Sequence, residues 1–246
     1  MSKQIVVTEK EILHHIKLSK RLPSLIDEVV RLNIIKSTAA EIGIQVSTEE
    51  LQKSADYLRI IQKLTSGDET WKWLHHHGMS LDDFEESVYN FVITTKLAQH
   101  LFAEQIEPFF YEYQLDYSSV SFHEIVLENE DLAIELFYAI AEAEISFSEA
   151  ASQYIQDTEL QRCGGYRGKV PRQQLKPEIA VAIYAAEPPQ LLQPILTSKG
   201  VHLIFVDEII QPKLNDKLRE KILLELLTQW LVEKVSQSEV VRAIEM

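Results

Sequence analysis

The chain has 246 residues, of which 46% are hydrophobic, so it can bury the core of one large domain or of two small ones. Its formal net charge of −14 opposes the counterion release that drives nucleic-acid binding, and no cluster of Lys and Arg interleaved with aromatic residues reverses this locally, so we exclude nucleic-acid partners. Membrane insertion is also excluded, because no apolar run approaches the ~20 residues that span a bilayer.

The beginning of the chain does not have the pattern of a signal peptide. Charged residues interrupt it repeatedly, and its longest apolar run, Ile5 to Val7, is too short for a signal-peptide core. The only cysteine, Cys163, excludes an intrachain disulfide and any multi-cysteine metal site, which fits a reducing compartment. We therefore expect a cytoplasmic protein.

Residues 23–115 are predicted to be helical, because their apolar residues recur every three or four positions. In a capping box, a serine and an acidic residue three positions later satisfy each other's amides at the start of a helix. Two pairs have this spacing: Ser47 with Glu50 and Ser80 with Asp83. We expect four or five helices in this region, the longest over residues 81–106.

The pattern changes near Tyr117, where we predict the start of a new domain. The segment "SSVSFHEIVL" (118–127) is typical of a strand buried on both faces. Two helical stretches follow, then a loop, "RCGGYRGKVP" (162–171), a helix near "KPEIAVAIYAA" (176–186), and an apolar strand, "GVHLIFVDEI" (200–209). The predicted order of this domain is therefore strand, helix, helix, loop, helix, strand.

After Pro212 the chain is predicted to return to helix. Five apolar residues lie on one stripe of this helix: Leu214, Leu218, Ile222, Leu226 and Trp230. Such a stripe needs an apolar partner, and the N-terminal helices offer the nearest uncovered apolar surface.

Five segments in order, "VSFHEIVL", "FSEAASQYIQD", "CGGYRG", "PEIAVAIYAA" and "LTSKGVHLIFVDEI", together resemble the parvulin-type (PpiC or rotamase) peptidyl-prolyl cis-trans isomerases. This resemblance covers about residues 117–210. The flanking segments "LPSLIDEVVRLNIIKSTAAEIGIQVSTEELQKSADYL" and "LHHHGMSLDDFEESVYNFVITTKL" resemble the helical N-terminal domain of SurA-type chaperones.

The resemblance implies an α+β fold with two domains. A helical SurA-N-like chaperone domain (1–116) would be completed by the C-terminal helix (211–246), which packs on it. A parvulin-type rotamase domain (117–210), with a small, mainly antiparallel sheet surrounded by helices, would lie between them in the chain.

The resemblance also implies four catalytic residues: His123, Asp157, Thr197 and His202. In the family the first-strand and last-strand histidines lie back to back and share a hydrogen bond, so each ring can fix the tautomer of the other. The pair would orient a third group, here Asp157, and Thr197 would support the two histidines. A histidine inside an apolar strand can also be a satisfied core residue, so the two histidines can be purely architectural.

Four positions match the family's proline pocket: Arg167, Val170, Leu175 and Ile179. Leu175 and Ile179 keep an apolar floor, but the aromatic face that packs against a pyrrolidine ring is missing. Cys163 precedes the Gly-Gly pair and is interpreted as a loop residue. Acidic residues occupy the segment where a phosphate-binding site would need basic ones, so phosphopeptide specificity is not expected.

We predict a peptidyl-prolyl cis-trans isomerase and chaperone that binds unfolded or extended, proline-containing polypeptides. Rotation about an X-Pro bond breaks no covalent bond, so we expect neither a cofactor nor a metal. The alternative is a weak or inactive parvulin-fold holdase or substrate adaptor. The four matching catalytic positions favour the enzyme, and the missing pocket aromatics favour the adaptor. The client and the oligomeric state are not predicted.

Overall fold

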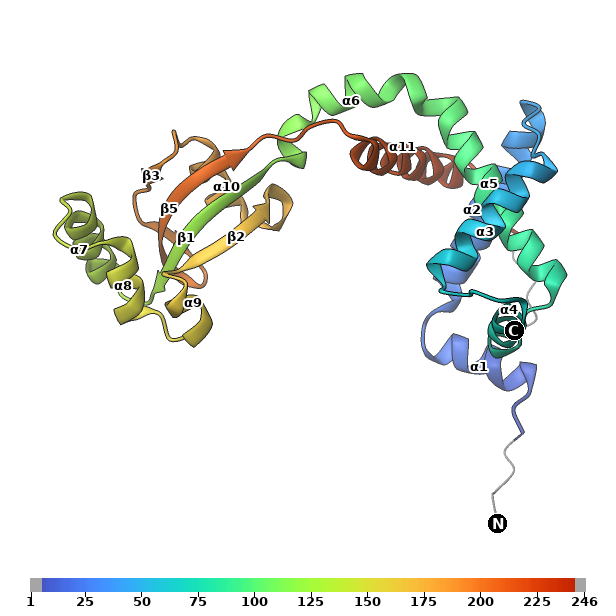
Figure 1. Ribbon diagram of the computed structural model, residues 1–246, viewed down its shortest axis with the longest axis horizontal. Coiled ribbons are helices and arrows are strands. Elements are labelled where there is room, and N and C mark those ends of the chain that lie inside the picture. The colour runs from blue at the N-terminus through green and yellow to red at the C-terminus, as the bar shows by residue number, and fades with distance from the viewer. Residues whose placement is uncertain (1–5, 242–246) are drawn as a thin grey trace, which may run out of the picture. The chain divides into compact units, whose positions relative to one another are not determined.

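The computed structural model describes residues 6–241, which form two compact units (Figure 1). One unit contains the residues up to Ile106 together with those from Arg219 on, and the other is Glu107–Leu218. One is helical and the other holds a small sheet surrounded by helices, which confirms the predicted fold class. The predicted domain boundaries, after residues 116 and 210, lie within ten residues of these divisions and stay predictions.

The helical unit is built from long helices with well-defined starts. Its main helices are α1 (Glu9–Leu18), α2 (Leu22–Glu41), α3 (Thr48–Ile61), α4 (Gly67–His77), α5 (Leu81–Phe102) and α11 (Asp216–Ser236). The predicted capping boxes of α3 and α5 are confirmed: Ser47 and Ser80 each accept the amide N–H three residues on, and Glu50 and Asp83 accept the serine N–H in return. These reciprocal bonds satisfy amides that the helix itself leaves without partners.

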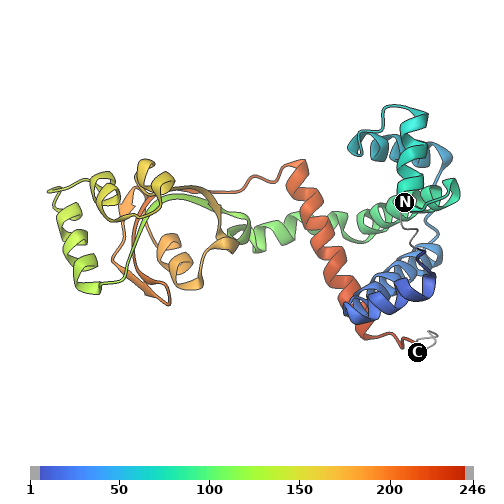
Figure 2. The same cartoon turned by 90° about the horizontal axis from the view of Figure 1, so that it is seen from below.

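The C-terminal helix α11 packs within the helical unit. It crosses α5 in Figure 2, and the Trp230 ring meets the Phe102 ring edge to face at 6.5 Å between centroids. Ile222 and Leu226, from the predicted apolar stripe, are buried. Leu214 lies before the start of α11 and so does not belong to the helical stripe.

The second unit is organised around a small antiparallel sheet. Its strands are β1 (Ser119–Leu127), β2 (Tyr166–Pro171), β3 (Gln190–Leu191), β4 (Ile195–Thr197) and β5 (Gly200–Ile210). Its helices are α7 (Glu130–Ala141), α8 (Phe147–Tyr154), α9 (Thr158–Arg162) and α10 (Pro177–Tyr184), and α6 (Ile106–Glu112) leads into it. The strand order is β2-β1-β5-β3, and β4 also pairs with β5.

The prediction of a loop over residues 162–171 was wrong for its second half, because residues 166–171 form β2. Glycines make this segment read as a loop, yet it pairs with β1, with Val120 opposite Val170. Gly168 has a φ of +68°, a left-handed backbone conformation that glycine adopts without strain. It sits where β2 has one residue more than β1, so the glycine permits a β-bulge within the strand.

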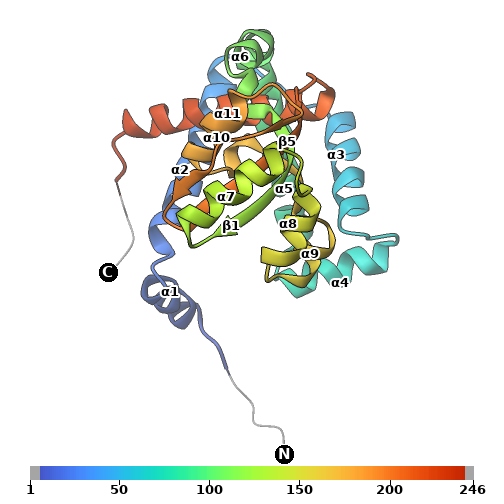
Figure 3. The ribbon, with the colours of Figure 1, turned by 90° about the vertical axis from the view of Figure 1, so that its left-hand side faces the viewer.

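The sheet separates two hydrophobic clusters. The face that we call the α7 face packs Ile125, Leu127 and Leu203 against α7 and α8, the helices nearest the viewer in Figure 3. The opposite face, the α10 face, packs Phe122 and Ile204 against α10. The residues of each strand alternate between the two faces, so the position of a residue in its strand decides which cluster it joins.

Strand β5 carries a second bulge. Ser121 pairs with Glu208, but Phe122 pairs with Val206, so Asp207 is an extra residue on β5. A bulge bends the strand and re-aims the side chains beside it. Among residues 6–241, no helix has both the length and the apolar character needed to cross a membrane.

Candidate functional site

The α10 face brings together most of the predicted site residues. Ile179 is buried there, and Val170 and Leu175 pack against the same cluster from β2 and from the turn before α10. Phe122, from β1, belongs to this cluster and was missed by the sequence analysis. Its ring is buried, and a second aromatic residue, Tyr184 of α10, packs against the same cluster while partly exposed. The three predicted apolar pocket positions therefore meet on one surface.

A buried hydrogen-bonded chain lies on the same face. His202 is 4% exposed, and its Nδ1 lies 2.8 Å from Oε1 of Glu124, which is 9% exposed. Its Nε2 lies 2.8 Å from Oγ1 of Thr197. A carboxylate accepts, so Nδ1 of His202 donates to Glu124, while Nε2 shares a hydrogen bond with the Thr197 hydroxyl, which also reaches the Gly200 carbonyl oxygen at 3.4 Å. Both ring nitrogens of His202 thus have partners, and the ring is held in one orientation.

Two basic residues border this chain of hydrogen bonds. Arg167 Nε lies 3.4 Å from Glu124 Oε2. At the other end, Lys176 Nζ donates to Thr197 Oγ1 at 3.2 Å and to Ser198 Oγ at 3.3 Å. The arrangement is an apolar floor beside a buried carboxylate and imidazole, with a cation at each end.

The predicted hydrogen bond between His123 and His202 was wrong. The two residues lie on opposite faces of the sheet, because His123 shares the α7 face with Ile125 whereas Glu124 shares the α10 face with Phe122. His123 Nδ1 donates instead to the Gly164 carbonyl oxygen at 2.8 Å. Glu124 therefore occupies the position predicted for His123 as the partner of His202.

Strand alternation was the signal that could have identified Glu124. In "SFHEIVL", the apolar residues Ile125 and Leu127 lie on the same face of the strand as His123, because alternate residues share a face. Phe122 shares the opposite face with Glu124. A carboxylate on the same buried face as an aromatic residue needs a hydrogen-bond partner, and His202 is that partner in the structure.

Asp157 serves as the N-cap of α9. Its Oδ1 accepts the Leu160 amide N–H at 2.9 Å, a contact that stabilises the start of a short helix. None of the interactions described within residues 6–241 joins it to His202 or Thr197. The catalytic role of Asp157 stays a prediction.

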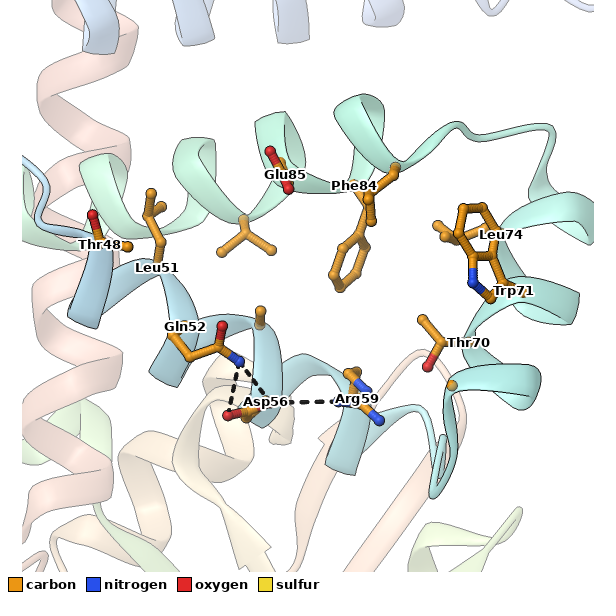
Figure 4. A pocket seen from close by; sticks show the side chains of 14 residues that line it. Thr48, Leu51, Gln52, Asp56, Arg59, Thr70, Trp71, Leu74, Phe84 and Glu85 are labelled. Atoms are coloured by element: carbon orange, nitrogen blue, oxygen red, sulfur yellow. Dashed lines mark hydrogen bonds and ion pairs between the residues drawn. The ribbon is translucent and has the colours of Figure 1, made fainter.

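The helical unit contains a separate pocket between α3, α4 and α5 (Figure 4). It has a volume of about 490 Å³. Phe84 points into it, Trp71 borders it and is 59% exposed, and Asp56 and Arg59 form its polar edge. Its other lining residues include Leu51, Leu74, Leu81 and Val88. Polar residues line the pocket beside the apolar ones, among them Gln52, Thr70 and Glu85. A partly open pocket with an apolar wall and a polar edge suits an apolar side chain of a polypeptide.

Comparison with known proteins identifies the class of the sheet-containing unit. Residues 128–208 match the Rotamase family, described as the PPIC-type PPIASE domain. The chain therefore carries a peptidyl-prolyl isomerase domain of the PPIC type, as predicted.

The similarity to particular proteins extends over both units. The foldase protein PrsA of Halalkalibacterium halodurans is 24% identical over 227 residues, which are 84% of this chain and 67% of that protein. The crystal structure of the peptidylprolyl isomerase PrsA from Bacillus anthracis is 18% identical, covers 89% of this chain and 100% of its own, and has a TM-score of 0.50. The structure of PrsA from Bacillus cereus is 17% identical, covers 99% and 95% of the two chains, and has a TM-score of 0.54. These matches confirm the predicted peptidyl-prolyl isomerase, and the two structures share the fold of most of the chain, the helical unit included.

Proposed function

We propose that this chain works as a SurA-like foldase of the kind represented by PrsA, in which the α10 face accelerates X-Pro rotation and the helical unit holds client segments. One observation carries the first half: Val170, Leu175 and Ile179 pack together beside the buried Glu124–His202–Thr197 chain, within the PPIC-type domain. The pocket between α3, α4 and α5 carries the second half.

The chemistry follows from the barrier to amide rotation, which is on the order of 20 kcal/mol because the planar form has partial double-bond character. The planar form separates charge, with the carbonyl oxygen negative, and water stabilises it. An apolar floor around the pyrrolidine ring excludes that water, and the buried Glu124 carboxylate opposes negative charge on the carbonyl oxygen. Each ~1.4 kcal/mol removed from the barrier accelerates rotation tenfold.

The basic rim supports a preference for clients with an acidic residue before proline. Arg167 stands at a position where the resemblance implies an apolar residue, and Lys176 lies at the other end of the Glu124–His202–Thr197 chain. Lys199 is exposed beside Thr197, whose Oγ1 accepts the Lys199 N–H. A client carboxylate would meet these cations in an otherwise acidic protein.

Exchange spectroscopy on unphosphorylated X-Pro peptides tests the isomerase half of the proposal. We expect the full chain to accelerate cis/trans exchange and Leu175→Ala to reduce the acceleration about tenfold, because a truncated floor readmits water. The matched control is Leu196→Ala, which changes an exposed leucine on β4. Equal rates with and without the protein would contradict the proposal and leave the adaptor alternative. The cytoplasmic location stays a prediction.

A further inference from the structure

The α7 face of the sheet carries a cluster of aromatic rings that the isomerase proposal does not use. His123 on β1 lies 5.8 Å from Phe147 and 5.2 Å from Tyr166 between ring centroids. Phe205 on β5 lies 6.5 Å from His123 and 6.3 Å from Phe147. Rings from β1, β2, β5 and α8 therefore meet at one place, on the side of the sheet opposite His202.

A pocket of about 510 Å³ opens beside these rings. Its wall contains His123, Phe147 and Phe205 with the turn between α7 and α8, and its lining holds two glutamates, Glu144 and Glu149, but neither Lys nor Arg. Hydrogen bonds from the backbone and hydroxyl of Ser146 hold the pKa of Glu149 below its ordinary value. The pocket is therefore aromatic and negatively charged at neutral pH.

A carboxylate lies next to the rings. His123 Nδ1 donates to the Gly164 carbonyl oxygen, and His123 Nε2 lies 3.5 Å from Asp207 Oδ1. The other carboxylate oxygen, Asp207 Oδ2, is buried and has no hydrogen-bond partner within the part of the chain that the structure describes. Oδ1 is therefore the oxygen of Asp207 that a donor in the pocket could approach, beside the His123 ring.

Two β-bulges shape the sheet at this place. The β5 bulge is Asp207 itself, and the bulge at Gly168 lies two residues after Tyr166. Bulges re-aim the side chains beside them and are common next to functional sites. Ala143, in the pocket wall, has a φ of +59° because it closes α7, where the Ala143 and Glu144 N–H groups donate to the last carbonyl oxygens of the helix.

We propose that this pocket binds the cationic side chain of a Lys or Arg residue in an extended polypeptide. The ammonium or guanidinium group lies over the rings of Phe147 and Phe205, near Glu144 and Glu149, and donates a hydrogen bond to Asp207 Oδ1. Aromatic faces and carboxylates both attract a cation, whereas an anion would meet only like charge. The inference rests on the proposed function only for the source of the cation, the client polypeptide.

A short proline-free peptide with one central Lys, and its norleucine and Glu counterparts, provides the test with the full chain. Binding is followed by fluorescence anisotropy of labelled peptides and by the ring signals of His123 and Phe205 in NMR. We expect the Lys peptide to bind about tenfold more tightly than the norleucine peptide, since it alone offers charge and donors. Equal affinity of the two peptides would overturn the proposal.

Two variants and two matched controls locate the site. Asp207→Asn and Phe147→Leu should each weaken binding of the Lys peptide about fivefold. Asp131→Asn removes a carboxylate from α7 and Tyr138→Leu removes an exposed ring there, and both should bind as the wild type does. Phe147→Tyr keeps the ring and should keep the affinity, which separates a lost contact from a misfolded protein. Unchanged binding by Asp207→Asn would overturn the proposal.

The outcome for this site is independent of the outcome for the isomerase. The peptides lack proline, so their binding requires no prolyl isomerase activity, and Leu175→Ala on the α10 face should bind the Lys peptide normally. Loss of Lys-peptide binding in Leu175→Ala would assign the cation to the α10 face and contradict the proposed pocket.

Discussion

Glu124 and His202, which are 78 residues apart in the sequence, are joined by a 2.8 Å hydrogen bond in the centre of the sheet. Both side chains are almost completely buried, and Thr197 holds the other nitrogen of the imidazole. A buried carboxylate and a buried imidazole are each costly alone, and each satisfies the other here. The bond fixes the orientation of the His202 ring and the position of a carboxylate beside the apolar floor.

Removing Glu124 tests the importance of this bond. Glu124→Ala leaves the Nδ1–H of His202 buried without a partner, which should lower the free energy of unfolding by about 1–3 kcal/mol. Glu124→Gln keeps an acceptor for Nδ1–H and should cost less than half as much. Urea denaturation measures the stability, and imidazole ¹⁵N shifts report the tautomer. Equal stability of Glu124→Ala and wild type would show that the bond contributes nothing net.

Substrate preference tests the basic rim. The kcat/KM for a Glu-Pro peptide should exceed that for the matching Lys-Pro peptide by about three- to tenfold, as expected for partly exposed charge pairs. Arg167→Leu should reduce this ratio towards one. Lys169→Leu changes the other exposed cation of β2, which pairs opposite Ser121 rather than lying at Glu124, and should leave the ratio unchanged. A preference that survives Arg167→Leu would mean that other groups select the residue before proline.

The local structure of this chain could be predicted from its sequence, whereas the partner of His202 could not be predicted from the resemblance. Ser47 with Glu50 forms its capping box because both groups lie within one helical turn. Strand β2 was missed because the glycines at 164, 165 and 168 are typical of a loop. Residues 166–171 are a strand because they pair with β1. The Glu124–His202 contact depends on register across the sheet, which a motif match based on residue type alone does not establish.

The pocket in the helical unit should support chaperone activity. Trp71→Ala removes a large exposed ring from its border and should raise the concentration of protein needed to suppress aggregation of an unfolded client by about fivefold. Light scattering of a chemically denatured, proline-poor client measures this without involving the isomerase. Tyr57→Ala is the matched control, because Tyr57 is similarly exposed on α3 and does not line the pocket. An equal loss of aggregation suppression in both variants would indicate nonspecific binding of the client to exposed aromatic rings.

Glu50 should make the helical unit sensitive to acid. A hydrogen bond from Lys96, followed by those from Ser47, lowers the pKa of Glu50 from 4.5 to about 2. The folded state therefore binds fewer protons than the unfolded state between these values, so the stabilisation is present above pH 4.5 and disappears as the pH falls to about 2. Thermal unfolding should show Glu50→Gln below wild type at pH 7 and level with it near pH 2. Glu49→Gln, which loses only an exposed pair with Lys53, should follow the wild type throughout.

Asp207 should cost the protein stability at neutral pH. Burial raises the pKa of this carboxyl group, and the opposing effect of His123 is smaller. Between the ordinary value of 3.8 and the raised pKa, the folded state thus binds more protons than the unfolded state. The free energy of unfolding therefore falls as the pH rises from 3.8 through the raised pKa.

Asp207→Asn removes the charge that burial disfavours, so this variant should unfold at a higher temperature than wild type at pH 7. Its free energy of unfolding should rise by less than about 1 kcal/mol, because water reaches the group. The difference should vanish near pH 3, where the native carboxyl is already protonated. The same substitution is expected to weaken binding of the Lys peptide. The Asp207 carboxylate would then serve binding at a cost in stability. A lower unfolding temperature for Asp207→Asn at pH 7 would show instead that the His123–Asp207 pair stabilises the sheet.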